Sequence, residues 1–424
     1  MERFSGIFGI IFILICAYLM SNNRKAINKR VVLTGLTLQV LLAVFILKVP
    51  LGQKLFSFIG LGISQLLDFS HEGALFVFGV LVKKEVLDTV FGPGNSFIFI
   101  FSLLPTIIFV CVLISIAYHF GIMQRVVSVI ARFVHWFMHV SGSEALSNVA
   151  SAFVGQVEAQ IMIKPYLNKM TRSELLASMT GSMACISGGI MAVYISMGIP
   201  AAYLLAASLM AAPGALVIAK IVYPETEKSE TSGYVALDVK KEHINVLDAI
   251  SKGASDGWQV SVNVIAMLIG VIALITMIDA FVSWLGYLVT LTGFGIDGFD
   301  LRSLKLGDIF GVLFSGIAWL MGVPWKDANT VGSLMGTKMV INEFVAYSNL
   351  IPLIKSGAIS TKAIIIASFA LCGFANFSSI AIQVGGIGVL APSRRADLAT
   401  LGFKALICGT MASFISAALA GMIL

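Results

Sequence analysis

Apolar runs long enough to cross a membrane recur from one end of this sequence to the other. A helix needs about 20 predominantly apolar residues to cross the hydrocarbon core of a bilayer. Only 12% of the 424 residues are charged, whereas about a quarter are charged in soluble domains. The 40 glycines fit a membrane protein, because small residues let membrane helices approach closely. The sequence therefore predicts an all-α protein that crosses a lipid bilayer several times.

Basic residues predict which loops face the cytoplasm. The stretch NNRKAINKR follows the first apolar run, and Arg394 and Arg395 follow a later one. Residues 226–254 form the one long hydrophilic loop, which we also place inside. About eight spans with both termini outside satisfy these clusters. Residues 52–95 hold short apolar pieces broken by charges and a Gly-Pro turn, which predicts interfacial helices.

The same composition argues against several other classes of protein. The net charge of +6 comes without a basic stretch interleaved with aromatic residues, so we expect no nucleic-acid partner. The five cysteines lie in apolar runs without CxxC spacing, which argues against disulfides and zinc. His135 and His139 lack a third ligand, so no metal site is expected. Nothing in the sequence indicates an organic cofactor.

Two apolar regions are interrupted in a matching way. SAFVGQVEAQIMIKP (151–165) and GTKMVINEFVAY (336–347) each place a glycine near a glutamate. Each precedes a span with a polar break, CISGGIMAVY (185–194) and FANFSSIAIQVGG (374–386). Paired interruptions in two halves indicate inverted repeats that meet at a midplane site. Non-helical backbone is tolerated there only where it lines a cavity or is buried in protein. We therefore predict two opposed re-entrant hairpins.

The two glutamates of these segments, Glu158 and Glu343, are candidate functional groups. A charged carboxylate at the bilayer centre costs roughly 2.5–3.5 kcal/mol on insertion scales, so keeping two of them suggests that they are used. They would accept hydrogen bonds from a polar solute, or carry a proton, because burial raises the pKa of a carboxyl group. The alternative is that they form structural ion pairs with Lys164 and Lys338, or lie at an interface.

The sequence resembles the concentrative nucleoside transporter family. GQVEA followed by KP, then NEFVAY and FANFSS, carry the resemblance, together with SNNRKAIN and MAAPGALVIAKIVYPETE. It covers essentially the whole chain. It implies eight transmembrane helices, two re-entrant hairpins, a homotrimeric scaffold and a transport domain that moves like an elevator. It further implies a symporter that imports nucleosides across the inner (cytoplasmic) membrane of a bacterium, and not an enzyme.

The resemblance also implies a division of the chain. Scaffold segments are expected in residues 1–95 and 255–300, and the two repeats in 96–225 and 301–424, separated by the loop 226–254. The hairpins are expected near residues 145–170 and 304–350, and the broken helices near 185–190 and 374–380.

Single residues receive roles from the same resemblance. The implied substrate-binding residues are Gln156, Val157, Glu158, Ile190, Glu343, Phe374, Asn376 and Ser379. Those of the first hairpin, with Ile190, would contact the nucleobase, and Phe374 would lie beside it. Glu343 would accept from the ribose hydroxyls, because adjacent hydroxyls can donate together to one carboxylate. Asn376 and Ser379 would make the other ribose contacts.

The first hairpin tip departs from the family pattern. Val157 stands where the family usually has Thr, and Gln160 where Pro is common. A hydroxyl partner for the base is therefore missing, which keeps an importer of free nucleobases or modified nucleosides as an alternative. A membrane-embedded hydrolase using the two glutamates is a rival from another class, but no nucleophile or metal cluster accompanies them. A non-transporting receptor is a third alternative.

The ion-binding positions depart as well. Ser151 and Cys185 replace the Asn and Ser found in sodium-coupled members. Sodium prefers oxygen ligands, and a thiol is a poor substitute. The Ser151 hydroxyl and the carbonyls of Val154 and Ile186 remain as possible ligands. We therefore favour protons over sodium as the coupling ion.

Overall fold

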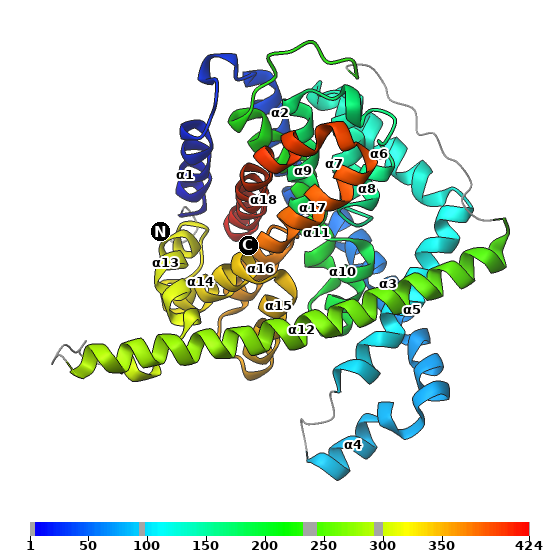
Figure 1. The fold of residues 1–424 in the computed structure, drawn as a ribbon, viewed down its shortest axis with the longest axis vertical. Helices are drawn as coiled ribbons and strands as arrows, with labels where there is room; N and C mark the ends of the chain where they lie inside the picture. Colours follow the sequence, from blue (N-terminus) through cyan, green and yellow to red (C-terminus); the bar gives the residue numbers. More distant parts are fainter. Residues whose placement is uncertain (1–4, 93–97, 232–243, 292–299, 424) are drawn as a thin grey trace.

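The computed structural model describes residues 5–92, 98–231, 244–291 and 300–423. Within these ranges the chain forms helices and no strand, which confirms the all-α prediction (Figure 1). Four helices precede the repeats: α1 (Ser5–Leu19), α2 (Lys29–Leu47), α3 (Pro50–Phe78) and α4 (Lys84–Phe91). Short 3-10 turns lie at Arg24–Ala26, Gly79–Val82, Leu167–Lys169, Leu301–Ser303 and Pro392–Arg394.

The remaining helices follow one order twice: a long helix, a shorter helix, a hairpin, a broken span and an unbroken span. The first series is α5 (Phe99–His119), α6 (Ile122–Met138), α7 (Gly142–Ser151), α8 (Glu158–Ile161), α9 (Arg172–Ala184), α10 (Gly188–Ser196) and α11 (Ala201–Val222). The second is α12 (Val246–Leu291), α13 (Leu306–Leu320), α14 (Trp325–Val340), α15 (Glu343–Ser356), α16 (Thr361–Leu371), α17 (Phe377–Leu390) and α18 (Arg395–Ile423). The order of elements therefore repeats as predicted, but the second series begins with α12, in residues that the prediction assigned to the loop and the scaffold.

Six helical segments of the described chain are long and apolar enough to cross a membrane on their own: α2, α5, α9 with α10, α11, α12 and α18. Shorter apolar helices are α1, α16 and α17; the expected number of eight crossings is reached if α1 counts as one crossing and the broken pair α16 and α17 as another. Helices α13 and α14 meet at 119°. Such an angle suits a chain that turns back within the membrane better than a straight crossing.

The two broken spans cross at their breaks. The backbone N–H of Phe374 donates to the carbonyl of Cys185 at 3.2 Å. Gly373 has φ +142°, and a Cβ there would lie 2.6 Å from the carbonyl oxygen of Ala184. Only glycine meets both conditions. Ser413 of α18 donates to the carbonyl of Cys372 at 3.0 Å, so part of the backbone freed by the breaks finds a partner.

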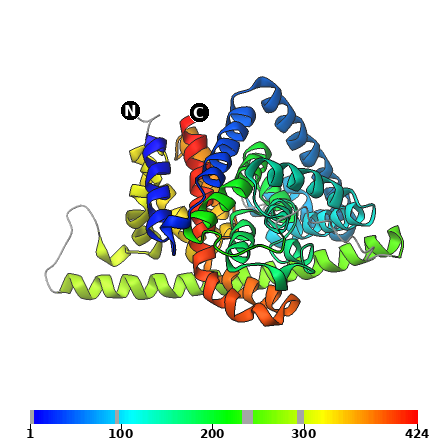
Figure 2. The same cartoon turned by 90° about the horizontal axis from the view of Figure 1, so that it is seen from above.

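Helix α12 is a single rod of 46 residues, about 70 Å long at 1.5 Å per residue. It runs across the whole molecule in both views (Figures 1 and 2). It packs on α5 through small residues: a Cβ on Gly253 would lie 2.7 Å from the Cα of Val112. Its start at Val246 lies inside the stretch predicted as a loop, because Asn245 caps it by accepting from the N–H of Asp248 at 2.9 Å. The loop prediction to residue 254 is therefore wrong at its end.

Helix α3 differs in one respect from the interfacial helices predicted for this region: its length. Residues 50–78 form one helix of 29 residues rather than short interfacial pieces. Its buried residues recur at helical spacing, for example at Gly52, Phe56 and Gly60, and so form one narrow stripe along the helix. Only this narrow stripe packs against the protein, so polar residues on the other sides do not interrupt the helix.

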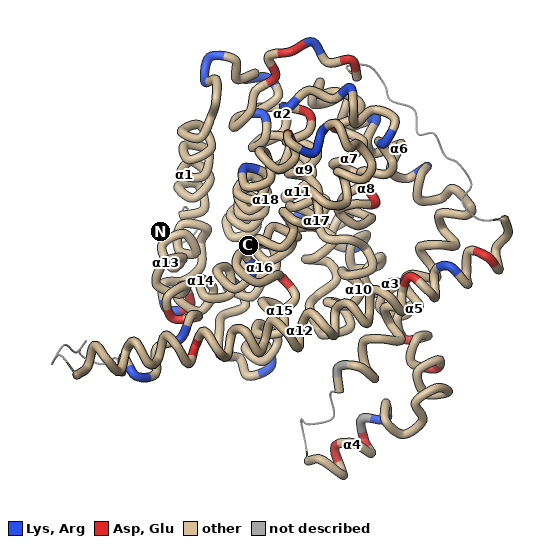
Figure 3. Tube along the Cα trace, viewed as in Figure 1, with Lys and Arg blue, Asp and Glu red and all other residues tan. Residues whose placement is uncertain are grey.

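The two ends of the described chain lie on one side. Gly6 of α1 lies against Met422 of α18. Lys and Arg residues gather at the opposite end, where α1 joins α2 and where α18 begins, with others along α12 and near α4 (Figure 3). This distribution agrees with the positive-inside rule if the ends of the chain face outward.

Candidate functional site

Glu343 is the first residue of α15, the second arm of the second hairpin. Its side chain is buried, at 6% exposure. The hydroxyl of Tyr194 donates to Oε1 at 3.0 Å, and Nδ2 of Asn376 donates to Oε2 at 3.2 Å. A carboxylate offers about four acceptor positions, so roughly half of this acceptor capacity remains for a solute.

The ion pairs considered as an alternative do not form among the described residues. Lys338 is buried, but its Nζ donates to the carbonyl of Ala370 at 2.9 Å, and no ion pair joins it to Glu343. No ion pair joins Glu158 to Lys164 either within this part of the chain. The ion-pair explanation therefore fails for both glutamates, whereas a position of Glu158 at an interface stays open, because its side chain is exposed.

Asn376 connects the Glu343 carboxylate to the break of the second repeat. Its Oδ1 caps α17 by accepting from the N–H of Ser379 at 2.9 Å, and it also accepts from the hydroxyl of Ser378 at 2.7 Å. Its Nδ2 remains for Glu343. The amide orientation follows from these contacts, because only the oxygen can accept.

The first hairpin tip lies against α17 of the other repeat. Gln156 donates through Nε2 to the hydroxyl of Ser379, and Nε2 of Gln383 donates to Oε1 of Gln156, both at 3.5 Å. These distances lie at the long end of the hydrogen-bond range. Val157 packs on Gly386, where a Cβ would lie 2.6 Å from Cγ2 of the valine. The residue that departs from the family pattern therefore makes an apolar contact here.

Glu158 differs from Glu343. It begins the short α8, and it is exposed, so the expectation of a desolvated carboxylate is wrong at this position. Its carboxylate lies in the space that a Cβ on Gly155 would take. The irregular chain between α7 and α8 turns the side chain outward. Ile190 and Phe374 are half-buried beside the breaks of α9–α10 and α16–α17.

The residues matched to a sodium site are engaged with the protein. The hydroxyl of Ser151 donates to the carbonyl of Ser147 at 2.7 Å and lies 2.9 Å from the hydroxyl of Ser182. The thiol of Cys185 donates to the carbonyl of Ser208 at 3.6 Å. Val154 and Ile186, whose carbonyls are the other expected ligands, are buried. The Ser151 hydroxyl already bonds Ser147 and Ser182, and the Cys185 thiol bonds Ser208. These two groups are therefore poor ligands for a hard cation such as sodium.

Gln160, the second departure from the family pattern, joins the first hairpin to α9. Its Nε2 donates to the hydroxyl of Ser182 at 2.8 Å, and its Oε1 accepts from Ser178 at 2.7 Å. The side chain is fully buried. Both ends of the amide are satisfied, so the hairpin stays attached to α9 without the rigid proline.

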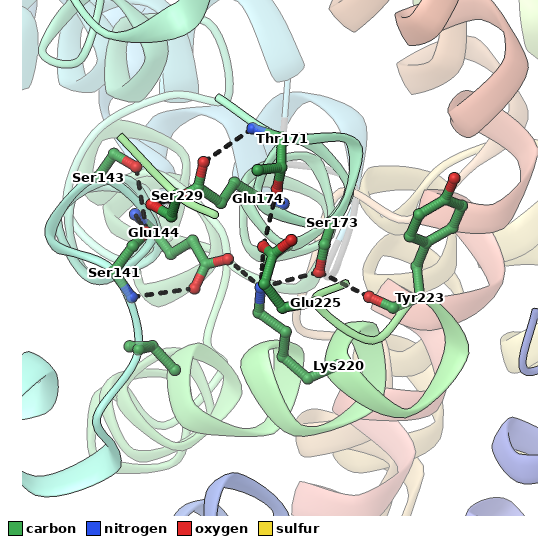
Figure 4. Close-up of polar contacts among 12 residues, drawn as sticks. Ser141, Ser143, Glu144, Thr171, Ser173, Glu174, Lys220, Tyr223, Glu225 and Ser229 are labelled. Atoms are coloured by element: carbon green, nitrogen blue, oxygen red, sulfur yellow. Dashed lines mark hydrogen bonds and ion pairs between the residues drawn. The ribbon is translucent and has the colours of Figure 1, made fainter. Parts of the chain in front are cut away.

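A second polar cluster lies at the N-terminal ends of α7 and α9 (Figure 4). Lys220 of α11 pairs with Glu144, lies 3.4 Å from Glu225 and donates to Ser173 at 2.8 Å. Glu174 accepts from the hydroxyl of Thr231 at 2.7 Å. These contacts fasten the chain after α11 onto two helix ends, where carboxylates are stabilised by the helix dipole. The cluster is structural, and the two S/T-x-x-E capping boxes at Ser141 and Thr171 were its readable signal.

A cavity of about 370 Å³ lies between α3, α5 and α10. Its polar lining includes Asp68, His71 and Ser196. None of the residues predicted to bind substrate lines it. The predicted site therefore lies apart from this cavity.

Two residues that touch the predicted site were not anticipated: Tyr194 and Gln383. Both are fully buried. Gln383 was visible as a lone amide in an apolar run, SSIAIQVGG, and such residues in membrane spans are usually functional. Tyr194 carried no comparable signal, because an aromatic residue in a span is ordinary.

Three family models match the chain. Their descriptions are "Na+ dependent nucleoside transporter N-terminus" at residues 8–81, "Nucleoside recognition" at 100–201, and "Na+ dependent nucleoside transporter C-terminus" at 203–421. Together they span both repeats.

Among curated proteins, the chain is 43% identical to the uncharacterized transporter YutK of Bacillus subtilis, over 98% of both chains. It is 36% identical to the nucleoside permease NupC of Helicobacter pylori, over 99% of this chain and 98% of that one. It is 37% identical to the sodium/nucleoside cotransporter 1 of Rattus norvegicus, over 100% of this chain and 64% of that one.

Solved structures of one transporter, CNTnw, share the fold. The inward-facing, substrate-bound state matches with a TM-score of 0.92 at 40% identity, over 100% of this chain and 98% of that one. A variant in an intermediate state matches with a TM-score of 0.93 at 40% identity, over 100% and 99% of the two chains.

Proposed function

The chain belongs to the concentrative nucleoside transporter family, a family of cation-coupled elevator-type membrane transporters, and we propose that it imports nucleosides across the bacterial cytoplasmic membrane as a symporter. The observation that carries the proposal is the buried carboxylate of Glu343, with one donor on each oxygen and acceptor capacity to spare. A ribose presents two adjacent hydroxyls that can donate to such a group.

The proposed substrate contacts follow from where the side chains lie. Glu343, Asn376 and Ser379 bind the ribose. Gln156 reads the edge of the base through its amide, and Phe374 supports the face of the ring. The remaining contacts proposed at the base are Val157, Glu158 and Ile190. Val157 and Ile190 are apolar, so discrimination between bases rests mainly on Gln156.

We propose protons as the coupling ion. The support lies in the Ser151 hydroxyl, which is already used by Ser147 and Ser182, and in the Cys185 thiol, which is bonded to Ser208. Sodium bound through the Ser151 hydroxyl and the carbonyls of Val154 and Ile186 is the alternative. A homotrimer and outward-facing termini are further proposals that rest on the family resemblance and on the basic inner loops.

The testing experiment is uptake of labelled uridine and adenosine into proteoliposomes under an inward proton gradient or, separately, a sodium gradient. Uptake driven by protons alone supports the whole proposal. Uptake driven by sodium refutes the coupling ion but keeps nucleoside import.

Two added measurements separate the rivals. Competition by uracil rather than uridine would indicate a nucleobase importer. Recovery of the labelled solute chemically unchanged after uptake would exclude a hydrolase.

A further inference from the structure

The second halves of the two broken spans carry a buried polar side chain at the same position. Ser187 caps α10 and Asn376 caps α17, each through its side chain. Tyr194 is the seventh residue after the first cap, and Gln383 is the seventh after the second. Both side chains are fully buried. The two residues are therefore equivalent in the inverted repeats.

Each of the two residues reaches the hairpin tip of the other repeat. Tyr194, in the first repeat, donates to Glu343 in the second, at 3.0 Å. Gln383, in the second repeat, donates to Gln156 in the first, at 3.5 Å.

Each of the two side chains also makes a second contact within its surroundings. The ring of Tyr194 lies 4.5 Å from that of Tyr347, centroid to centroid. Nε2 of Gln383 also donates to the carbonyl of Met179 at 3.2 Å. Both are held firmly enough to orient what they touch.

We propose that Tyr194 and Gln383 are paired positioning residues, and that they set the sugar selectivity and the base selectivity of the transporter respectively. The proposal rests on the proposed nucleoside import. Neither residue needs to touch the substrate, because each acts through the binding residue on the opposite tip.

Tyr194 acts on the sugar through the orientation of a carboxylate. Its hydroxyl occupies one acceptor position of Glu343 Oε1, while Asn376 occupies one on Oε2. The plane of the carboxylate is then fixed, and the free acceptor positions face a fixed direction. Without the hydroxyl, the carboxylate can rotate, and two adjacent ribose hydroxyls no longer meet two aligned acceptors.

Gln383 acts on the base through the orientation of an amide. Its N–H selects the oxygen of Gln156, so the NH₂ of Gln156 faces Ser379. Uridine presents an acceptor at C4 and a donor at N3, whereas cytidine presents the reverse. A flipped Gln156 exchanges its donor and acceptor and so erases the preference between them. The Oε1 of Gln383 has no hydrogen-bond partner among the described residues, so the side chain acts there as a donor, to Gln156 and to the carbonyl of Met179.

The test compares Tyr194→Phe and Gln383→Leu in proteoliposomes, using kcat/KM for uridine, 2′,3′-dideoxyuridine and cytidine. Tyr194→Phe should lower the uridine preference over the dideoxy analogue about tenfold and leave the uridine-to-cytidine ratio within about twofold. Gln383→Leu should do the reverse, lowering the base ratio about threefold to tenfold.

Matched controls are available in the chain. Tyr347→Phe removes a buried hydroxyl beside Tyr194 that bonds the carbonyl of Ser368 instead. Gln39→Leu removes a buried amide that instead donates to the carbonyl of Met210 in α11 and to Ser416 in α18. Both should leave the two ratios unchanged. If Gln383→Leu does not fold, Gln383→Asn keeps the amide but shortens its reach and should give the same loss.

Selectivity ratios do not change when a variant merely lowers the amount of folded protein. The proposal is overturned if both ratios fall together in one variant, if neither changes, or if the controls match the variants. Wild-type protein that imports no nucleoside would overturn the proposed function itself, and this proposal with it.

Discussion

The two hairpin tips begin from the same sequence signal, a glycine and a glutamate in an apolar segment, and end in different environments. In the second hairpin, α14 and α15 have 16 and 14 residues and place Glu343 in the interior. In the first, α7 of 10 residues leads through an irregular stretch to α8 of only 4, and Glu158 is exposed.

The difference lies in the hydrogen-bond donors that other helices supply. A buried charge needs hydrogen-bond partners. Tyr194 and Asn376 provide them for Glu343, whereas no described side chain donates to the carboxylate of Glu158. The amide of Gln383 meets Gln156 instead. Burial of a carboxylate here is therefore decided by donors from distant parts of the chain, and not by local hydropathy.

Glu343→Gln is the change with the largest expected effect. It removes the charge that two ribose hydroxyls would share, and each charged hydrogen bond is worth about 1.5–3 kcal/mol. Uridine uptake should fall by at least about 100-fold. The glutamine keeps the shape, so size-exclusion chromatography should show folded protein. Normal uptake by this variant would refute the ribose assignment.

Glu158→Gln sharpens the comparison, because it is the same substitution at the exposed tip. We expect uridine uptake to fall only about tenfold, since one solvated contact is lost rather than a buried pair. If Glu158 carries the coupling proton, uptake will also stop responding to an imposed proton gradient, while counterflow of substrate continues. A loss equal to that of Glu343→Gln would mean that the tips are equivalent after all.

Gly386→Ala tests the contact that seats the first tip on α17. The added Cβ would lie 2.6 Å from Cγ2 of Val157, so the tip must withdraw and the KM for uridine should rise roughly threefold to fivefold. Gly385→Ala is the adjacent control, because a Cβ there meets nothing within 4 Å. Equal effects of the two substitutions would show that the contact does not seat the tip.

Val157→Thr should have the smallest effect. Threonine restores the hydroxyl usual in the family at nearly the same volume, but it places a polar group against Gly386. We expect the KM for uridine to change by about twofold, with Glu343-dependent ribose selectivity unaltered. A large gain in affinity would instead show that the missing hydroxyl limits base binding.

The sequence predicted the spans and both breaks, because hydropathy and polar breaks are local signals. A glutamate in an apolar segment predicted burial correctly at Glu343 and wrongly at Glu158. The length of α12 and the continuity of α3 were missed. For α12, charged residues at the end of the apolar run suggested that the helix ended there, although it continues. For α3, the buried residues form only a narrow stripe, so polar residues on its other sides were read as interruptions. The exposure of Glu158 and the contacts of Tyr194 and Gln383 depend on pairing between distant segments. A single sequence does not carry that information.

The bonds between the repeats also set an order of events during synthesis. Tyr194 and Glu343 are 149 residues apart, and Gln156 and Gln383 are 227 apart. At about 5–20 residues per second, the ribosome needs roughly 7 to 45 s to deliver the partner of each early segment. Until α17 has been synthesised, the first hairpin therefore lacks the contact between Gln156 and Gln383. A nascent chain stalled before residue 377 should consequently expose this hairpin to protease, and one released after α18 should protect it.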